Sequence, residues 1–327
     1  MLLDECLAAR REPPFRARQI WEWAAGGAGS YEQMTNLPFD LRAALADAVP
    51  FSSLAPAREA LARDGTAKVL FETADGRPVE TVLMRYRDGR RSLCLSSQSG
   101  CPLTCTFCAT GRMKFGRNLT ASEILDQALH FRRTDAVNHA VFMGMGEPLM
   151  NLDNVLAACE RLPELGIPTS ATGISTVGWV PGIERLADEG APVRLALSLH
   201  AADEALRSEL MPVNERYPLA DVLAACLRWH ERRRRQVFVE YLMLDGVNDR
   251  YEQALELAAV LQPRRAFKVN LIPYNPTDAG FRGSSRDAIA AFRSALEQRG
   301  LRTTVRLTRG RDIDAACGQL AALGREP

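Results

Sequence analysis

Residues 92–108, SLCLSSQSGCPLTCTFC, join a short apolar run to three cysteines. These are Cys101, Cys105 and Cys108, which have the spacing C-x3-C-x2-C on one predicted loop. Structural zinc sites use four ligands, commonly in two paired arms, and no second arm follows here at a suitable spacing. Iron–sulfur clusters are bound by thiolates, and three cysteines leave one iron of a 4Fe-4S cluster open to a further ligand. The loop therefore indicates an iron–sulfur site, with a zinc or purely structural loop as the alternative.

Apolar, strand-like runs alternate with helix-like stretches from about residue 91 onward. The runs are SLCLSS, NHAVFMG, TGIST, VRLALSLH, QVFVEYLML and FKVNLIP. This alternation predicts parallel β/α units with a sheet buried on both faces. Thr120 and Glu123 match a capping box at the start of the first crossover helix. Six units predict a partial (β/α)6 barrel, in which the cysteine loop follows the first strand, at the barrel end where active sites lie.

The region before the predicted barrel has a different sequence pattern. Residues 1–60 contain amphipathic stretches such as FRARQIWEWAAGG and NLPFDLRAALADAV, which predict a small helical accessory domain. Residues 61–90 hold AKVLFET and PVETVLMRY on either side of Asp75-Gly76, a strong hairpin signal. We therefore expect an α/β protein in three parts: a helical domain over 1–60, a linking β-hairpin over 61–90 and the barrel over 91–327.

Composition limits the class of protein. The chain has 327 residues, of which 46% are hydrophobic, enough for a sizeable core. It has no apolar run of roughly 18 residues and no secretory leader, which predicts a cytoplasmic protein without a membrane partner. A net charge of +1 gives no global case for nucleic-acid binding, so any RNA site must be a local patch.

Eight cysteines in a reducing compartment are ligands, nucleophiles or packing residues rather than a disulfide framework. Cys6, Cys159 and Cys226 are scattered through helix-like stretches, and we interpret them as small buried hydrophobic residues. The triad, together with Cys94 and Cys317, needs another explanation.

In its context the triad resembles the radical S-adenosylmethionine (SAM) motif of the RlmN/Cfr family of RNA methyltransferases. The similarity spans nearly the whole chain, through SLCLSSQSGCPLTCTFCATG, RNLTASEI, VFMGMGEPLMN, LSLHAADEALR, VNLIPYNP and TRGRDIDAACGQL. It implies a radical SAM barrel in which Cys101, Cys105 and Cys108 bind a 4Fe-4S cluster. The SAM contacts that it implies all follow predicted strands on one barrel face: Gly146, Glu147, Ser175, Ser198, Leu199, His200 and Asn275.

The resemblance also assigns roles to the remaining groups. Two SAM molecules are used per turnover: one methylates Cys317, and the other is cleaved to a 5′-deoxyadenosyl radical that activates this methyl group for addition to adenine. A radical route is needed because the adenine carbon carries no nucleophilic lone pair. Cys94 is the resolving cysteine, which releases the product through a transient disulfide with Cys317. Glu80 is the proton acceptor, with Glu72 as the neighbouring alternative. Without the resemblance, the two cysteines would be interpreted as buried packing thiols.

The tail TRGRDIDAACGQL is closer to the RlmN type than to the Cfr type. The resemblance thus implies methylation of adenosine C2 in 23S rRNA and tRNA, whereas a Cfr-type enzyme would methylate C8. It further implies a monomer without an obligate protein partner, and a flavodoxin or ferredoxin-like electron donor. Residues 1–60 would add RNA contacts through Phe15, Trp21 and Trp23, unless these aromatic residues pack helices.

Two other classes stay open. A radical SAM enzyme for a protein or small molecule, such as a glycyl-radical activase, would not need Cys94 and Cys317. A non-catalytic iron–sulfur or zinc module would not cleave SAM.

Overall fold

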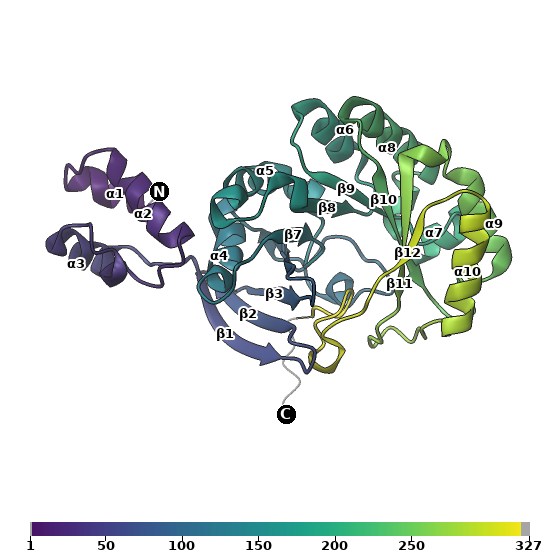
Figure 1. The fold of residues 1–327 in the computed structure, drawn as a ribbon, viewed down its shortest axis with the longest axis horizontal. Coiled ribbons are helices and arrows are strands. Elements are labelled where there is room, and N and C mark those ends of the chain that lie inside the picture. Colours follow the sequence, from purple (N-terminus) through teal and green to yellow (C-terminus); the bar gives the residue numbers. More distant parts are fainter. Residues whose placement is uncertain (1, 322–327) are drawn as a thin grey trace.

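The computed structural model describes residues 2–321. Three helices at the N-terminus, α1 (Leu2–Ala9), α2 (Phe15–Ala25) and α3 (Phe39–Ala48), form a small unit beside the α/β barrel (Figure 1). They enclose a core of their own that includes Ile20, Met34 and Leu45. Trp23 donates to Asn36 within this unit, whereas the Trp21 indole donates to Glu164 of the barrel, 2.5 Å away. Both tryptophans therefore make contacts inside the folded protein.

A ten-stranded sheet forms the centre of the described chain, in the order β1-β2-β3-β4-β7-β8-β9-β10-β11-β12. The first four strands pair antiparallel, and every pair from β4 to β12 is parallel. The strands are β1 (Leu54–Leu61), β2 (Ala67–Thr73), β3 (Pro78–Arg85), β4 (Arg91–Cys94), β7 (His139–Phe142), β8 (Thr172–Thr176), β9 (Arg194–Ser198), β10 (Val237–Met243), β11 (Phe267–Pro273) and β12 (Thr303–Val305). A separate small sheet pairs β5 (Gln98–Ser99) with β6 (Arg117–Asn118).

Helices cover the outer face of the parallel part of the sheet (Figure 1). They are α4 (Ala121–Arg132), α5 (Leu152–Arg161), α6 (Val180–Glu189), α7 (Glu204–Leu210), α8 (Leu219–Arg233), α9 (Tyr251–Val260) and α10 (Arg286–Gln298). Short 3-10 helices complete the chain: Tyr31–Gln33, Thr110–Arg112, Pro148–Asn151, Leu162–Leu165, Thr169–Ala171, Pro212–Glu215, Arg264–Ala266 and Arg311–Ile313. The predicted capping box is confirmed, because Thr120 Oγ1 accepts from the Glu123 N–H and Glu123 accepts from the Thr120 N–H.

The predicted partial barrel is confirmed. All six expected strands form, and β12 adds one further parallel strand at the open edge. The turn at Asp75-Gly76 joins β2 to β3, with Gly76 at a φ of +71°. No helix within residues 2–321 combines the length and apolarity needed to cross a membrane.

The structure differs from the expected division at residues 54–61. Most of this alanine-rich stretch lies in the 1–60 range assigned to the helical domain, yet it forms β1 and pairs along its length with β2. Pairing with a neighbouring strand outweighs intrinsic helix propensity here, which is a weak preference that tertiary context often overrides. The link between the helices and the barrel is therefore a three-stranded antiparallel extension of the barrel sheet.

Candidate active site

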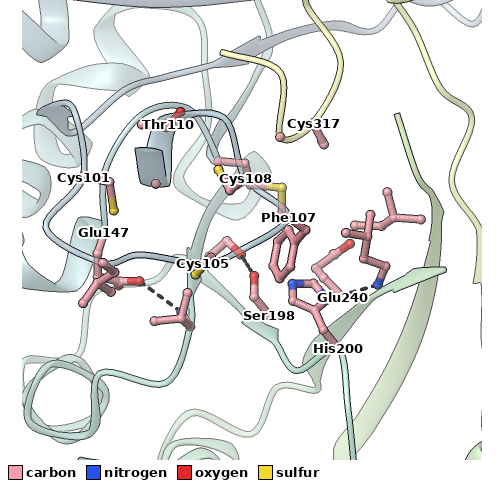
Figure 2. A pocket seen from close by; sticks show the side chains of 18 of the residues that line it. Cys101, Cys105, Phe107, Cys108, Thr110, Glu147, Ser198, His200, Glu240 and Cys317 are labelled. Carbon is pink, nitrogen blue, oxygen red and sulfur yellow. Dashed lines mark hydrogen bonds between the residues drawn. The ribbon is translucent and has the colours of Figure 1, made fainter. Parts of the chain in front are cut away.

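The cysteine loop lies above the carboxyl ends of the parallel strands. Cys101, Cys105 and Cys108 all line one cavity. Figure 2 shows the cysteine loop, with Ser198, His200 and Glu240 lying beside Cys105 and Phe107. Gly100, at the start of the loop, has a φ of +72°, and a side chain there would lie 2.5 Å from the Lys114 carbonyl oxygen. Close backbone packing thus shapes the loop.

The three thiols are free, and their environment opposes ionisation. Burial raises the pKa of Cys101 to about 12 and also raises the pKa values of Cys105 and Cys108. Metal binding requires thiolates, so a bound cation must offset this cost. Three free thiols on one loop that face one cavity fit an iron–sulfur cluster, in which each thiolate binds a different iron. No group of three His, Cys, Asp or Glu side chains within residues 2–321 converges on a single-ion site.

Gly146 and Glu147 follow β7 and line the same cavity. Glu147 is buried, and its carboxylate accepts from the backbone N–H groups of Leu149 and Val177, at 3.1 and 3.0 Å. Burial nevertheless raises the pKa of Glu147 to about 7. Gln98 Oε1 accepts from the Glu147 N–H at 2.8 Å, and the φ of +96° at Gly146 lets the backbone pass against the Gln98 side chain. The cavity thus presents one carboxylate that titrates near neutral pH.

Ser175, Ser198 and His200 bring polar groups to the cavity from β8 and from the end of β9. The hydroxyl oxygens of the two serines lie 3.3 Å apart. Burial lowers the pKa of His200 to about 3, so the ring is neutral. Its Nδ1 accepts from the Leu242 N–H at 3.0 Å, and the ring packs edge-on against Phe107 of the cysteine loop. His200 therefore joins the loop to the strands.

Two of the implied SAM contacts lie elsewhere. Leu199 is fully buried, and its N–H donates to the Glu240 carbonyl oxygen rather than facing the cavity. Asn275 lines an adjacent cavity, where its side chain donates to the Cys317 carbonyl oxygen at 3.3 Å and accepts from Arg311. Asn275 therefore contacts the segment that carries Cys317.

Cys317 lines both cavities, whereas Cys94 lines only the adjacent one. Burial, followed by the nearby Cys317, raises the pKa of Cys94 to about 12. Both residues are free thiols, and no disulfide joins the cysteines of the described chain. The structure therefore does not support a standing disulfide bond as a property of this protein.

Glu80 is buried on β3 and lines neither of these cavities. Its carboxylate forms an ion pair with Lys68 of β2 at 2.9 Å. Lys68 also donates to the Asp314 carbonyl oxygen, three residues before Cys317. Glu72, the alternative proton acceptor, is exposed. Between these two carboxylates, only Glu80 shares a hydrogen-bonding partner with the C-terminal segment (residues 306–321).

Comparison with known proteins identifies the family. Residues 95–258 match the model of the radical SAM superfamily. A protein from Heliobacterium modesticaldum named "Probable dual-specificity RNA methyltransferase RlmN" is 47% identical, over 96% of this chain and 86% of the relative. A protein of the same name from Chloroflexus aurantiacus is 45% identical, over 98% of this chain and 90% of that protein. The chain belongs to the RlmN family of radical SAM methyltransferases.

A solved structure agrees with this RlmN-family assignment. The crystal structure of a radical SAM methyltransferase from Sphaerobacter thermophilus superposes with a TM-score of 0.93 and is 45% identical, over 98% of this chain and 97% of that one. The superfamily match includes the three loop cysteines but not Glu80, Cys94 or Cys317.

Sequence reasoning missed two charged residues of this RlmN-family cavity, Glu240 and Arg306. Glu240 is buried in the middle of β10, and Arg306 follows β12. A lone acidic residue in the apolar run QVFVEYLML is a usable signal, because buried charges are rare unless they are paired or functional. Arg306 carried no comparable signal among the many arginines of this chain.

Proposed function

We propose that this chain methylates C2 of an adenosine in 23S rRNA and in tRNA, through a methylated Cys317 and with two SAM molecules per turnover. The names of its relatives support RNA as the substrate. One structural observation carries the cysteine intermediate: Cys317 lines both the cavity of the cysteine loop and the cavity of Cys94. A single thiol is thus accessible from a methyl-activating site and from a second thiol.

Cys101, Cys105 and Cys108 would hold a 4Fe-4S cluster, which supplies a 5′-deoxyadenosyl radical from SAM. Gly146, Glu147, Ser175, Ser198 and His200 line the space for SAM, with Leu199 and Asn275 supporting the wall and the Cys317 segment. Glu147 is the acidic group suited to the SAM ammonium, because a carboxylate with a raised pKa gains most from a nearby cation. The neutral His200 adds no positive charge to the same site.

The thiol chemistry follows from the positions of the two cysteines. Cys317 accepts a methyl group as a thiolate. This methyl group would then lose a hydrogen atom to the 5′-deoxyadenosyl radical, and the resulting CH2 radical would bond to C2 of the adenine. Glu80 takes up the proton from C2. The Cys94 thiolate then attacks the Cys317 sulfur: the S–S bond of a transient disulfide forms as the S–C bond to the base breaks, and the released CH2 carbon takes up a proton to become the methyl group at C2. An electron donor, such as a flavodoxin or a ferredoxin-like protein, is needed to supply electrons.

The N-terminal helices offer a surface for RNA. Phe15 and Phe39 are 58% and 74% exposed, and each has an arginine over its ring, Arg16 and Arg42. Aromatic side chains with arginine neighbours form stacking platforms for unpaired bases. We place residues 1–53 as the accessory unit, 54–90 as the link and 91–327 as the catalytic barrel of a cytoplasmic monomer.

The decisive experiment is anaerobic reconstitution with iron and sulfide, followed by incubation with SAM, reductant and either 23S rRNA fragments or tRNA. Mass spectrometry of the nucleosides should detect 2-methyladenosine with wild type and none with Cys317→Ala, while the control Cys6→Ala keeps activity. 8-Methyladenosine would support the Cfr-type alternative instead. Formation of 5′-deoxyadenosine without any methylated base would support the other alternative, a radical SAM enzyme that acts on a non-RNA substrate.

The cluster has a separate test. Cys101→Ala should lose the absorbance and iron content of the reconstituted cluster, while Cys159→Ala, at a buried thiol within α5, should keep both. A cluster that persists in Cys101→Ala would contradict the assignment of the loop.

A further inference from the structure

A row of polar side chains crosses the parallel sheet at one level. Glu240 of β10 lies in register with Ser198 of β9 and Asn270 of β11, and Asn270 lies in register with Thr304 of β12. The Thr304 hydroxyl donates to Asn270 Oδ1 at 2.5 Å. The Asn270 amide donates in turn to Glu240 Oε1 at 2.8 Å. This chain of hydrogen bonds fixes the orientation of the Glu240 carboxylate.

The second oxygen of Glu240 is left without a hydrogen bond. Glu240 is only 3% exposed and lines the main cavity, and its Oε2 has no hydrogen-bond partner among the described residues. Arg306, which also lines the cavity, places Nη1 3.5 Å from this oxygen. Arg306 thus pairs with this oxygen electrostatically, but a buried acceptor without a hydrogen bond still costs free energy unless a ligand supplies a donor. The cavity wall therefore presents a hydrogen-bond acceptor beside a donor.

We infer that Glu240 and Arg306 bind the amino edge of an adenine ring, with Glu240 Oε2 accepting from the 6-amino group and Arg306 donating to the adjacent ring nitrogen. Adenine presents a donor beside an acceptor on this edge, which matches the pair. Guanine presents two acceptors on the corresponding edge, so its oxygen would face the carboxylate. The pair therefore selects adenine over guanine.

If the proposed function holds, the adenine of SAM and the target adenine of the RNA both enter this cavity. The inference rests on the proposed function only for the RNA adenine. The shared chemistry is the 6-amino group, so the test removes this group from the ligand. Purine riboside, which lacks only the amino group, replaces adenosine in S-adenosylhomocysteine in one arm and at the target position of the RNA in the other.

Glu240→Gln is the sharpest variant. Asn270 donates to the oxygen at the Oε1 position, so the amide nitrogen of the substituted side chain would face the cavity and present a donor where the wild type presents an acceptor. We expect reconstituted wild type to prefer the adenine ligand over the purine ligand by about 10- to 100-fold, the effect of a hydrogen bond to a charged group. Glu240→Gln should lose most of this preference, while Glu252→Gln, on the exposed side of α9, should retain it.

The two arms use different measurements. Equilibrium binding of S-adenosylhomocysteine and its purine analogue tests the SAM adenine without any turnover. Single-turnover methylation of the two RNAs tests the target adenine. If Glu240→Gln loses the preference for the adenine ligand in either measurement, the inference is supported. The measurement that changes identifies whether the adenine is that of SAM or that of the RNA. Wild type that shows no preference for the adenine ligand in either the binding or the methylation measurement overturns the inference, even if Glu240→Gln does not fold.

Two further results separate this inference from the proposed function. Full retention of the adenine preference by folded, cluster-containing Glu240→Gln overturns the inference, even where wild type methylates RNA. If wild type makes no methyladenosine, the proposed function is contradicted. The binding of S-adenosylhomocysteine and its purine analogue still decides whether Glu240 recognises the adenine of SAM.

Discussion

The ammonium group of Lys68 lies 2.9 Å from the Glu80 carboxylate and 3.1 Å from the Asp314 carbonyl oxygen. It thus joins β2, β3 and the C-terminal segment, which Figure 1 shows returning from β12 toward the antiparallel strands. The ion pair is largely buried, with side-chain exposures of 15% and 4%. One lysine therefore holds both the proposed base and the chain that carries Cys317.

Lys68→Met should destabilise the protein by about 3 kcal/mol, because removing one partner of a buried pair leaves the other charge uncompensated. Urea unfolding measures the change, and Lys114→Met, at an exposed lysine, is the matched control. The double variant Lys68→Met/Glu80→Gln should recover much of the loss. Equal stability of the Lys68 and Lys114 variants would contradict a structural role for the pair.

Gly146→Ala should weaken SAM binding at least tenfold. A Cβ at this position would lie 2.5 Å from the Gln98 side chain, which accepts from the Glu147 N–H, so the substitution displaces the support of Glu147. Gly65→Ala is the control, since Gly65 also has a positive φ, +81°, but open space around it. Both variants bear the cost of an unfavourable φ, about 1 kcal/mol. Equal SAM affinity in calorimetric titrations of the two variants would refute the steric argument.

SAM binding should depend on pH through Glu147. Burial raises the pKa of this carboxyl to about 7, so it is increasingly protonated below neutral pH and cannot pair with the SAM ammonium. Because bound SAM favours the carboxylate, the affinity for SAM should rise by at most tenfold per pH unit up to about pH 7 and level off above it. Titrations of wild type and Glu147→Gln from pH 5.5 to 8.5 test this, and a wild-type slope that survives in Glu147→Gln would assign it to another group.

Cys94→Ala should stop the reaction after the base has been attached to the enzyme. Without the second thiol, the bond between Cys317 and the methylated adenine cannot be exchanged for a disulfide. A covalent protein–RNA adduct should accumulate on denaturing gels and disappear on ribonuclease treatment. The control Cys226→Ala removes another buried thiol, from α8, and should release product normally. Free methylated RNA at the wild-type rate from Cys94→Ala would show that Cys94 is not the resolving cysteine.

Contiguous sequence determined much about this protein. The spacing of Cys101, Cys105 and Cys108 indicated the cluster loop, and the alternation of apolar runs predicted the partial barrel. Both signals are local, because a loop presents its ligands over a few residues and a strand carries its own pattern of burial. The strand at residues 54–61 gave no such local signal, since it exists only through pairing with β2.

Only the tertiary structure placed Cys317 between two cavities, joined Lys68 to Glu80 and left one oxygen of Glu240 facing Arg306. Lys68 and Asp314, which meet through a hydrogen bond, are 246 residues apart along the chain. Which side chains meet depends on strand order and register, and a shift of one residue would turn each of them to the other face of the sheet. Residue type and spacing specify the chemistry that a segment can offer, whereas the packing of distant strands decides which groups act together.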